Sequence, residues 1–550
     1  MFAEVPRALV NDRSPSALVS WAFHSCSVTV RIIPRELLGS PCLCRCSRTD
    51  VFIMGESVKR AGWTRTLAFT VCSAAIGGTF QYGYNISIIN APTAHVQSFI
   101  NASCVRRGAA LDPARVTLVW TLAVSVFPLG GLLGSLLAGP MAVRCGRRGA
   151  LLLNNMFLLL GALLALSCRA AGSFEMLITA RLLVGINAGV SMNVQPMYFG
   201  ESAPKHLRGA VAFSSAVFTA LGILMGQLAG LTAVLGSEER WHYLLSSNAL
   251  PGLLQLLLLP CCPESPRFLL IDRGDSDACA RALARLRSGS TAAEMEELLQ
   301  EQAQAGDAQA KTIWQLFADR SLRRQLCIVM TASSVMMLCG NDSIYFYASY
   351  IFQQAGIPSA SIQYVTVGTG ACEFLSAVTC NLLIERVGRR PLLAGGYLLM
   401  SCWAVVFTVA LSLQDAVPGM PYLSMTCVFA YILSFGMGPA GVTGILPAEL
   451  FQQTERPAAY MIAGSMMWLC LFLVGMAFPF IVAGLGQFCF LPFCGVCVAG
   501  CVFISCSLPE TKGRTLAEIT AEFQKRSGAA NGQPRYAEQP QTDPTEHIQM

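Results

Sequence analysis

The stretch Arg144-Cys145-Gly146-Arg147-Arg148 lies between two long uncharged runs. It returns with one residue changed as Arg386-Val387-Gly388-Arg389-Arg390, 242 residues later. Two more charged motifs recur in the same order, 248 and 246 residues apart: Glu201 with Arg208 and Glu449 with Arg456, then Pro263-Glu264-Ser265-Pro266 and Pro509-Glu510-Thr511-Lys512. Three motifs that repeat at nearly one period indicate an internal duplication, and therefore two similar halves.

The composition is that of a membrane protein. Of the 550 residues, 54% are hydrophobic and 13% are charged, and the mean hydropathy is +0.52. Soluble domains carry about 25% charged residues, so the deficit favours many membrane-spanning helices. The net charge of +6 is small for this length, which argues against nucleic-acid binding. Most of the 23 cysteines lie inside apolar runs, where cysteine acts as a small apolar residue and not as part of a disulfide framework.

Twelve charge-poor runs are long enough to cross a bilayer, which takes about 20 residues of helix. They cover residues 67–89, 116–143, 149–168, 182–200, 210–236, 241–262, 325–351, 362–384, 391–413, 422–446, 458–485 and 488–508. We therefore predict an all-α membrane protein with twelve transmembrane helices in two six-helix halves, related as parallel repeats.

The predicted domains follow from these runs. Residues 61–263 form the first half and residues 325–508 the second. Between them, the charged residues 264–324 are predicted to form a cytoplasmic linker with short amphipathic helices. Residues 1–60 show no convincing cleavable signal and are expected to be a disordered cytoplasmic extension. Residues 509–550 are expected to be a polar cytoplasmic tail.

Lysines and arginines predict the orientation of the helices. The basic loops follow the second, fourth and eighth runs, all on one side of the membrane. By the positive-inside rule that side is cytoplasmic, and both termini lie on it. The opposite loops are poorer in basic residues, although Arg106, Arg107 and Arg115 are exceptions. The same loop holds the glycosylation sequon Asn101-Ala102-Ser103, which this orientation places outside the cell.

The repeated charges lie at the predicted cytoplasmic ends of the helices. Basic and acidic members can pair when the halves close there and separate when they open, although an exposed pair is worth only about 0–1 kcal/mol. The alternative is that the positive charges only set the topology, which leaves the recurring acids unexplained. We expect a cytoplasmic gate made of these residues: Arg144, Arg147, Arg148, Glu201, Arg208, Glu264, Arg267, Glu385, Arg386, Arg389, Arg390, Glu449, Arg456 and Glu510.

The motifs resemble those of the sugar porter family of the major facilitator superfamily, the facilitative hexose transporters. The resemblance is carried, in order along about residues 60–515, by 80–85 (FQYGYN), 196–201 (PMYFGE), 263–267 (PESPR), 385–390 (ERVGRR), 448–451 (AELF) and 509–513 (PETKG). Within the family, Tyr82 and the absence of Trp from 439–446 resemble the class II group, which contains the fructose transporter. The resemblance implies the major facilitator fold, transport by alternating access and no cofactor.

Polar and aromatic residues inside the predicted spans are the candidates for a substrate site, because each must find a partner or line a hydrated cavity. The resemblance implies a sugar site near the middle of the membrane, between the halves. The chain departs from the sugar-binding pattern of the family at six positions: Ala216, Met336 and Met337 align with Gln, Asp342 and Glu373 with Asn, and Gly444 with Trp. We expect the substrate to contact Tyr82, Asn85, Ser215, Met336, Met337, Asp342, Glu373, Gly444 and Trp468.

Two features of the predicted spans have competing interpretations. Asp342 and Glu373 either make local polar contacts or bind substrate or protons, since a carboxylate inside a span is costly unless it is protonated, paired or hydrated. The Gly- and Pro-rich segment 436–447 is either the hinge of an extracellular gate, at Gly438, Pro439 and Gly441, or a site of close packing by small residues.

We therefore expect a facilitative hexose uniporter for glucose, fructose or both in the plasma membrane. The proton symporters of the family carry Asp where this chain has Asn85, which argues for uniport. Two alternatives stay open: a proton-coupled or organic-anion-exchanging porter that uses Asp342 and Glu373, and a sugar sensor that binds without transport. No enzymatic or metal site is expected, because the five histidines are scattered over loops and ends. The expected partners are a small sugar and the lipid bilayer.

Overall fold

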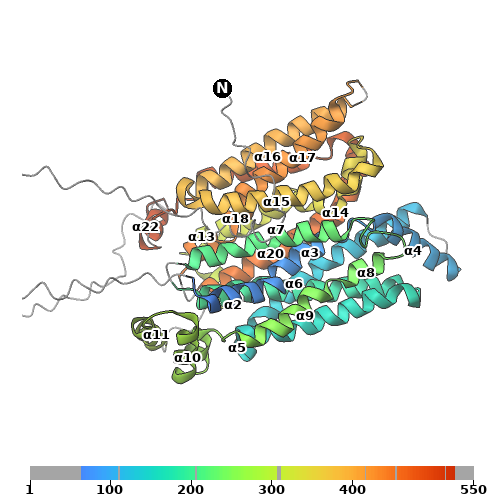
Figure 1. Cartoon of the computed structure of the whole chain (residues 1–550). Coiled ribbons are helices and arrows are strands. Elements are labelled where there is room, and N and C mark those ends of the chain that lie inside the picture. The colour runs from blue at the N-terminus through green and yellow to red at the C-terminus, as the bar shows by residue number, and fades with distance from the viewer. Residues whose placement is uncertain are drawn as a thin grey trace, which may run out of the picture. The chain divides into compact units, whose positions relative to one another are not determined.

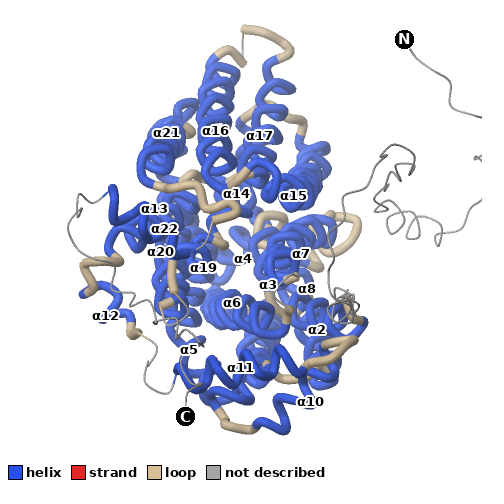
Figure 2. Tube along the Cα trace, turned by 90° about the vertical axis from the view of Figure 1, so that its left-hand side faces the viewer, coloured by secondary structure: helices blue, strands red, loops and turns tan. Residues whose placement is uncertain are grey.

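The computed structural model describes residues 63–108, 112–204, 207–305, 311–414, 416–452, 455–514 and 516–526. The expected N-terminal extension up to residue 60 and the end of the tail lie outside these ranges. Within them the chain forms helices and no β-strand (Figures 1 and 2).

The first half contains α2 (Arg65–Ile76), α3 (Thr79–Ser87), α4 (Thr93–Arg106), α5 (Pro113–Ala171), α6 (Phe174–Ser202), α7 (Arg208–Ala229), α8 (Trp241–Ser246), α9 (Ala249–Leu258) and η1 (Leu259–Cys261). The predicted second and third spans are both in α5, which changes direction at Gly146, where φ is 78° and ψ is 173°. The first span is split into α2 and α3 around Gly78, whose φ of −108° and ψ of −105° are not helical.

Short helices follow the first half: η2 (Phe268–Asp272), α10 (Ser276–Leu286), α11 (Ala292–Ala305) and α12 (Ile313–Ala318). The amphipathic helix α10 is tied to the first half by hydrogen bonds next to its C-terminus. Arg287 donates one to the carbonyl of Ser202 at 2.7 Å, and Thr64 donates one to the carbonyl of Leu286 at 2.9 Å.

The second half contains α13 (Arg323–Leu338), α14 (Asn341–Gln354), α15 (Ser359–Val387), α16 (Arg389–Ser412), α17 (Met420–Met437), α18 (Pro439–Thr443), α19 (Leu446–Leu450), α20 (Arg456–Leu485), η3 (Gly486–Phe488) and α21 (Leu491–Ser507), and α22 (Leu516–Arg526) follows it. The seventh span breaks at Gly340, whose φ is 86°. The tenth span breaks at Gly438 and again before α19.

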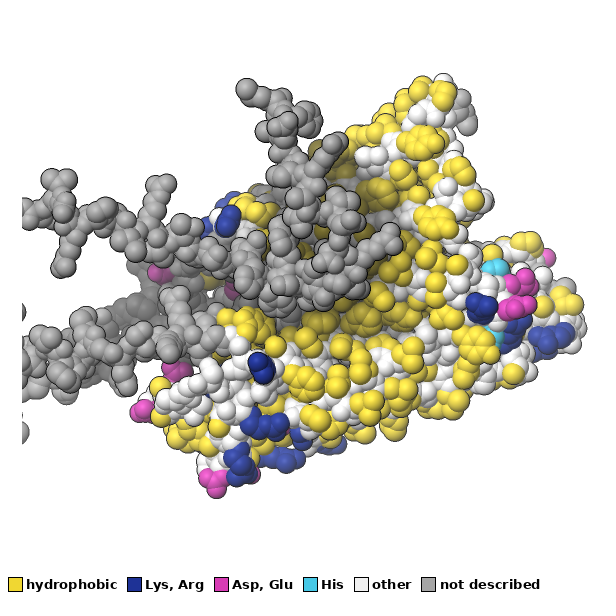
Figure 3. Space-filling view, in the orientation of Figure 1, with side chains coloured by type: hydrophobic (Ala, Val, Ile, Leu, Met, Phe, Trp, Pro, Cys, Tyr) yellow, Lys and Arg dark blue, Asp and Glu magenta, His cyan; other side chains and the backbone are white. Residues whose placement is uncertain are grey.

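The helices account for the twelve predicted spans. In the described ranges, nine helical stretches are long and apolar enough to cross a membrane. One of the nine is α5, which holds two spans, while α2 with α3 and the shorter α21 supply the first and the last. Figure 3 shows hydrophobic side chains over the middle of the visible face, with charged side chains toward its two ends, as expected for a surface in contact with lipid.

The two halves pack against each other mainly through three pairs of helices. Helix α5 contacts α20, α7 contacts α15, and α3 contacts α14. Seen from its end in Figure 2, the bundle has α15, α16, α17 and α21 on one side and α2, α3, α6 and α7 on the other. Helix α6 also contacts α20, and α18 contacts α7, so groups between the halves are presented by these eight helices.

At one end of the bundle the halves are joined by hydrogen bonds. Asn90 donates from its amide to the hydroxyl of Ser349 at 3.1 Å and accepts from the backbone N–H of Ser349 at 3.1 Å. Gln227 donates to the hydroxyl of Thr369 at 3.0 Å and accepts from the N–H of Gly370 at 3.0 Å. These bonds close the end of the bundle that lies away from the repeated charged motifs.

Candidate functional site

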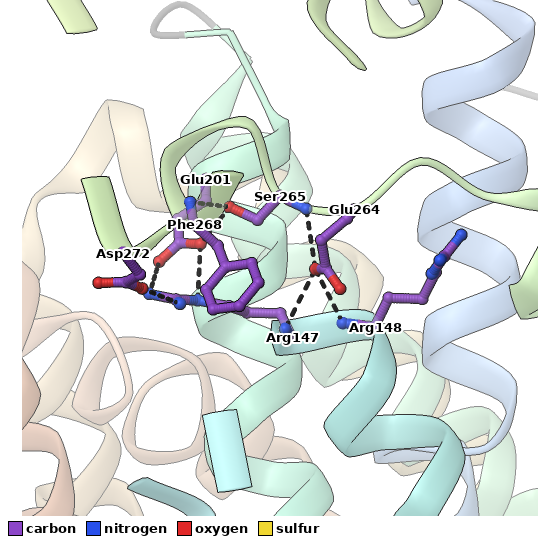
Figure 4. A network of polar contacts seen from close by, with 7 residues as sticks. All are labelled: Arg147, Arg148, Glu201, Glu264, Ser265, Phe268 and Asp272. Atoms are coloured by element: carbon purple, nitrogen blue, oxygen red, sulfur yellow. Dashed lines mark hydrogen bonds and ion pairs between the residues drawn. The ribbon is translucent and has the colours of Figure 1, made fainter. Parts of the chain in front are cut away.

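The first charged network is centred on Arg147, at the turn inside α5 (Figure 4). Its guanidinium donates to Glu201 at the end of α6, at 2.9 Å, and to Asp272 of η2, at 2.5 Å. It also lies 5.1 Å from the ring centre of Phe268. The hydroxyl of Ser265 donates a second hydrogen bond to Glu201. Planar guanidinium suits this arrangement because it pairs with two acids and stacks on a ring at once.

Glu264 holds the same turn through the backbone. Its carboxylate accepts hydrogen bonds from the N–H of Arg147 at 3.1 Å and of Arg148 at 3.0 Å. The turn admits the carboxylate because position 146 is glycine: a Cβ on Gly146 would lie 2.6 Å from a Glu264 oxygen. Arg148 in turn donates to the carbonyl of Cys262 at 2.8 Å. The acid thereby satisfies N–H groups at the start of a helical segment, where negative charge is favoured.

The second half repeats this construction. Arg389 donates to Glu449 at 3.0 Å, and Thr511 donates to the same carboxylate at 2.5 Å. Glu510 accepts from the N–H of Arg389 at 2.9 Å and of Arg390 at 3.1 Å. Gly388, with φ of 105°, provides the turn. Residues that look alike in sequence therefore make the same contacts in each half.

These contacts differ from the pairing expected between the halves. The pairs of Arg147 and Glu201, and of Arg389 and Glu449, each join helices of one half. Positions at helix ends are compatible with either arrangement, so the sequence could not distinguish them. The linker between the halves is joined to the second half by Lys311. Its ammonium group binds Glu455, next to α20, at 3.0 Å and Asp319, in the linker itself, at 2.9 Å.

The remaining residues of the expected gate do not make matching contacts in the two halves. Arg267 pairs with Glu301 at 2.6 Å, and Arg456 donates to the carbonyl of Phe451 at 3.0 Å. Arg144 and Arg386 are exposed. The side chains of two further residues lie outside what the structure describes: Arg208 and Glu385.

An aromatic cluster connects the halves deep inside the bundle. Tyr82 of α3 meets Trp468 of α20 edge to face, with ring centres 5.4 Å apart. Phe127 of α5 stacks on Tyr82 at 6.5 Å and meets Trp468 at 5.9 Å. Trp468 is fully buried, and it fits because a Cβ on Gly131 would lie 2.2 Å from its ring. Two of the expected substrate residues, Tyr82 and Trp468, are thus in contact.

A run of buried polar side chains begins α14, directly after the break in the seventh span. Asn341, Asp342 and Ser343 are 0%, 6% and 0% exposed. Both amide atoms of Asn341, one carboxylate oxygen of Asp342 and the hydroxyl of Ser343 find no hydrogen-bond partner among the described residues. Buried polar groups are nearly always satisfied, so three neighbours left over point to water or a ligand. The expected residue Glu373 differs, because it accepts from the hydroxyl of Tyr345 at 3.1 Å.

Asn85 is engaged within the first half. Its amide donates to the carbonyl of Gln81 at 2.9 Å and accepts from the amide of Asn248 at 3.1 Å. Arg181 of α6 donates to the backbone carbonyl of Asn85 at 3.1 Å. The side chain of Asn85 therefore sets the packing of α3, the helix that carries Tyr82.

Arg181 of α6 directly precedes the predicted span 182–200 and is not among the expected site residues. It is 4% exposed, and its guanidinium lies 4.6 Å from the ring centre of Phe127. Its Nε and one terminal nitrogen have no partner among the described residues. The signal in the sequence was an arginine inside a helical run, which is costly in a membrane and usually functional.

Comparison with known proteins identifies the family. The family described as "Sugar (and other) transporter" matches residues 70–523. The chain is also 56% identical, over 472 residues, to the human protein "Solute carrier family 2, facilitated glucose transporter member 11", covering 86% of this chain and 95% of that protein. The chain belongs to the sugar transporter family.

Other members of the sugar transporter family are also similar over nearly their whole length. Facilitated glucose transporter member 9 of Mus musculus is 41% identical over 498 residues, 90% of this chain and 93% of that protein. Member 5 of Equus caballus is 42% identical over 482 residues, 87% of this chain and 96% of that protein.

Solved structures show that this family member has the major facilitator fold. The proton:xylose symporter XylE bound to 6-bromo-6-deoxy-D-glucose superimposes with a TM-score of 0.71 at 22% identity, covering 83% of this chain and 99% of that one. A partially occluded inward-open form of XylE from E. coli gives 0.69 at 21% identity, covering 82% and 100%. The predicted fold class is therefore confirmed.

Four expected substrate residues of this sugar transporter have different environments. Ser215 accepts from Gln195 at 3.4 Å, Met336 is half-buried and Met337 is 1% exposed. Gly444 is exposed, and a Cβ there would meet nothing within 4 Å. A side chain could therefore start at position 444 without a clash at its Cβ.

The helix is interrupted at the expected hinge, which stays a prediction. Gly438 lies against Leu392, three residues after the charged-motif residue Arg389, so the interruption lies toward the charged end of the bundle and not toward the opposite end, where the extracellular gate was expected. Helix α17 ends at Met437, Gly438 is non-helical, and Pro439 begins α18. Close packing is present as well, because a Cβ on Gly438 would lie 2.3 Å from the carbonyl of Leu392, and one on Gly441 would lie 2.8 Å from the sulfur of Cys380. The sequon residue Asn101 is exposed on α4, at the end of the bundle away from the charged motifs.

Proposed function

We propose that this protein is a facilitative hexose uniporter, carrying glucose, fructose or both by alternating access across the plasma membrane. The relatives above are named facilitated glucose transporters. The observation that carries the proposal is the run of unpartnered polar groups at Asn341–Ser343, because it lies on α14, which contacts α3 with its Tyr82–Trp468 pair. Unsatisfied amide and carboxyl groups on a helix that contacts the helices of an aromatic pair suit a ligand with many hydroxyls and an apolar ring face.

The alternating-access proposal assigns a role to each end of the bundle. The Asn90–Ser349 and Gln227–Thr369 hydrogen bonds hold the halves together on what we take to be the extracellular side. On the opposite, cytoplasmic side, both charged networks keep each half rigid, so that the halves can move as units. In this arrangement both termini are cytoplasmic, residues 264–324 form a cytoplasmic linker, and Asn101 carries the external glycan.

The arrangement also favours uniport over proton coupling. Asn85 replaces the Asp of the proton symporters, and its amide is already hydrogen-bonded to Gln81 and Asn248. We assign no catalytic residue and no cofactor. The coupled alternative would need Asp342 or Glu373 to take up a proton during transport, and the named relatives do not favour it.

Uptake by purified protein in liposomes tests the proposal. Radiolabelled D-glucose, D-fructose and urate are supplied with and without a pH gradient. We expect saturable hexose uptake that only equilibrates the sugar and does not respond to the gradient. Accumulation driven by the gradient would replace uniport with proton coupling, and binding without any saturable flux would favour a sensor.

A further inference from the structure

A cavity of about 270 Å³ lies in the second half, away from the aromatic cluster and from the charged motifs. It is formed where α14, α16 and α20 end and η3 begins. Because α16 starts at the charged motif residue Arg389, its other end lies on the far side of the bundle. Gln354 of α14 lines the cavity, thirteen residues after Asn341 or about 20 Å along a helix, so the cavity is separate from the central site.

Three glutamines from three different elements converge on the cavity: Gln354 ends α14, Gln414 follows α16, and Gln487 lies in η3. Gln414 is half-buried, while Gln354 and Gln487 are exposed at the rim of the cavity. Each amide offers two donors and an acceptor with two lone pairs. The side chains that line the cavity carry no formal charge at neutral pH, so the ligand they suit is neutral and rich in hydroxyls.

Aromatic rings provide the apolar wall. Phe407 and Phe490 are 3% and 2% exposed and meet edge to face, with ring centres 4.8 Å apart. Tyr350 lines the same cavity and is 44% exposed, at its rim. Amides that fix orientation, set against aromatic walls, are the usual composition of a small-molecule site.

We propose that this cavity is an accessory binding site for a neutral monosaccharide-sized polyol, held by Gln354, Gln414 and Gln487 against Phe407 and Phe490. With the orientation proposed above, it opens to the outside of the cell, so external sugar occupies it without entering the transport path. A bound sugar would join the ends of α14 and α16, and α14 carries both the central polar run and Ser349.

Protection from a thiol reagent tests the site. Leu411 is half-buried and lines the cavity, whereas Leu413 is exposed and does not. Leu411→Cys and Leu413→Cys proteins in liposomes are labelled from outside with a membrane-impermeant maleimide, with or without D-glucose or D-fructose, and the labelling of the parent chain is subtracted. At a sugar concentration ten times its Kd we expect labelling at position 411 to slow about tenfold and labelling at 413 to stay unchanged.

The variant Gln354→Leu/Gln414→Leu separates this site from the central one. In that background the sugar should no longer protect position 411, while hexose flux in the same liposomes continues. Absence of protection in the first experiment overturns the proposal, and so does protection that survives loss of both glutamines, since it then comes from the central site. Labelling that is slow in liposomes with or without sugar, and fast in detergent, also overturns it, because a lipid chain then fills the cavity. Protection without flux keeps the site and rejects the uniporter.

Discussion

The carboxylate of Glu264 occupies the space next to Gly146 that a side chain at that position would need. It approaches closely enough to accept the N–H groups of Arg147 and Arg148, and Glu510 does the same beside Gly388. The glycine is therefore as much a part of the repeated motif as its arginines. It has positive φ in both copies, 78° and 105°, and leaves room for the acid.

Gly146→Ala should destabilise the protein by about 2 kcal/mol or more. A φ of 78° with a ψ of 173° costs a residue with a Cβ about 1–3 kcal/mol, and the displaced Glu264 would lose hydrogen bonds as well. Thermal unfolding in detergent measures the loss. Gly149→Ala is the matched control: its Cβ would lie 3.4 Å from its nearest neighbour, and alanine inside a helix is favoured over glycine by about 0.5–1 kcal/mol, so this variant should be at least as stable as the parent. Equal melting temperatures for both variants would contradict this account of the motif.

Arg147→Lys should lower stability by about 1–3 kcal/mol and slow transport, although the charge is kept. An ammonium group cannot bind Glu201 and Asp272 while stacking on Phe268, so one acid loses its partner. Thermal unfolding and initial uptake rates are the measurements. Arg144→Lys, at an exposed position of the same motif, should be within about 0.5 kcal/mol of the parent. If the two variants behave alike, the network does not hold the first half together.

The repeated motifs were sufficient to predict two similar six-helix halves, because each motif stands at the end of the corresponding helix in each half. Arg147 and Arg389 indeed bind the acids that repeat with them, Glu201 and Glu449. Asp272 was not predicted because it lies outside the three quoted motifs, although an acid, Glu518, follows Glu510 at the same eight-residue spacing. The pairing within each half was also missed, since position along a helix does not show which neighbouring helix the charge faces.

The pattern of apolar runs also could not show how deeply a residue is buried in the helix bundle or which neighbour it contacts. Arg181 stands just before the predicted span 182–200, where an arginine at the membrane surface is expected, yet it is buried against Phe127. Asn85 looked like a substrate ligand, yet its amide is engaged by Asn248. Tyr82 and Trp468 were chosen only as polar or aromatic residues within spans, and the fold brings them into contact.

Asn90→Ala should favour opening of the bundle at the end away from the charged motifs, where Asn90 and Ser349 join the two halves by hydrogen bonds. It removes two bonds to Ser349, each worth about 0.5–1.5 kcal/mol, so the balance between open and closed states should shift about 5- to 150-fold. Hydrogen exchange of the amides at the end of α14 should speed up accordingly. Ser349→Ala keeps the bond from its backbone N–H to Asn90 and should show about half the effect in free energy. Unchanged exchange in both variants would show that other contacts keep this end closed.

Asp319 should make stability depend on pH in acid. The hydroxyl of Ser321 and the ammonium of Lys311 lower the pKa of this carboxyl from 3.8 to about 2. Its contribution to stability is therefore complete above pH 3.8 and is lost as the pH falls toward 2. The difference in melting temperature between the parent and Asp319→Asn should therefore become smaller as the pH falls from 3.8 toward 2. Lys311→Gln, which removes one of the two causes, should show a smaller dependence than the parent; an equal dependence would assign the effect to Ser321 alone.

Asp342→Asn should lower the KM for hexose about fivefold, equivalent to about 1 kcal/mol, if the run at the start of α14 faces the sugar. Asn restores the amide that the family has at this position, and it offers both a donor and an acceptor where one carboxylate oxygen now lacks a partner. Glu373→Gln is the control: its side chain already accepts from Tyr345, which an amide oxygen can also do, so KM should stay within about twofold. Uptake kinetics with both proteins at equal surface density decide the matter. An unchanged KM for Asp342→Asn would show that Asp342 does not contact the sugar. The Tyr82–Trp468 pair, which joins α3 of the first half to α20 of the second, would then be the remaining candidate for the sugar contact.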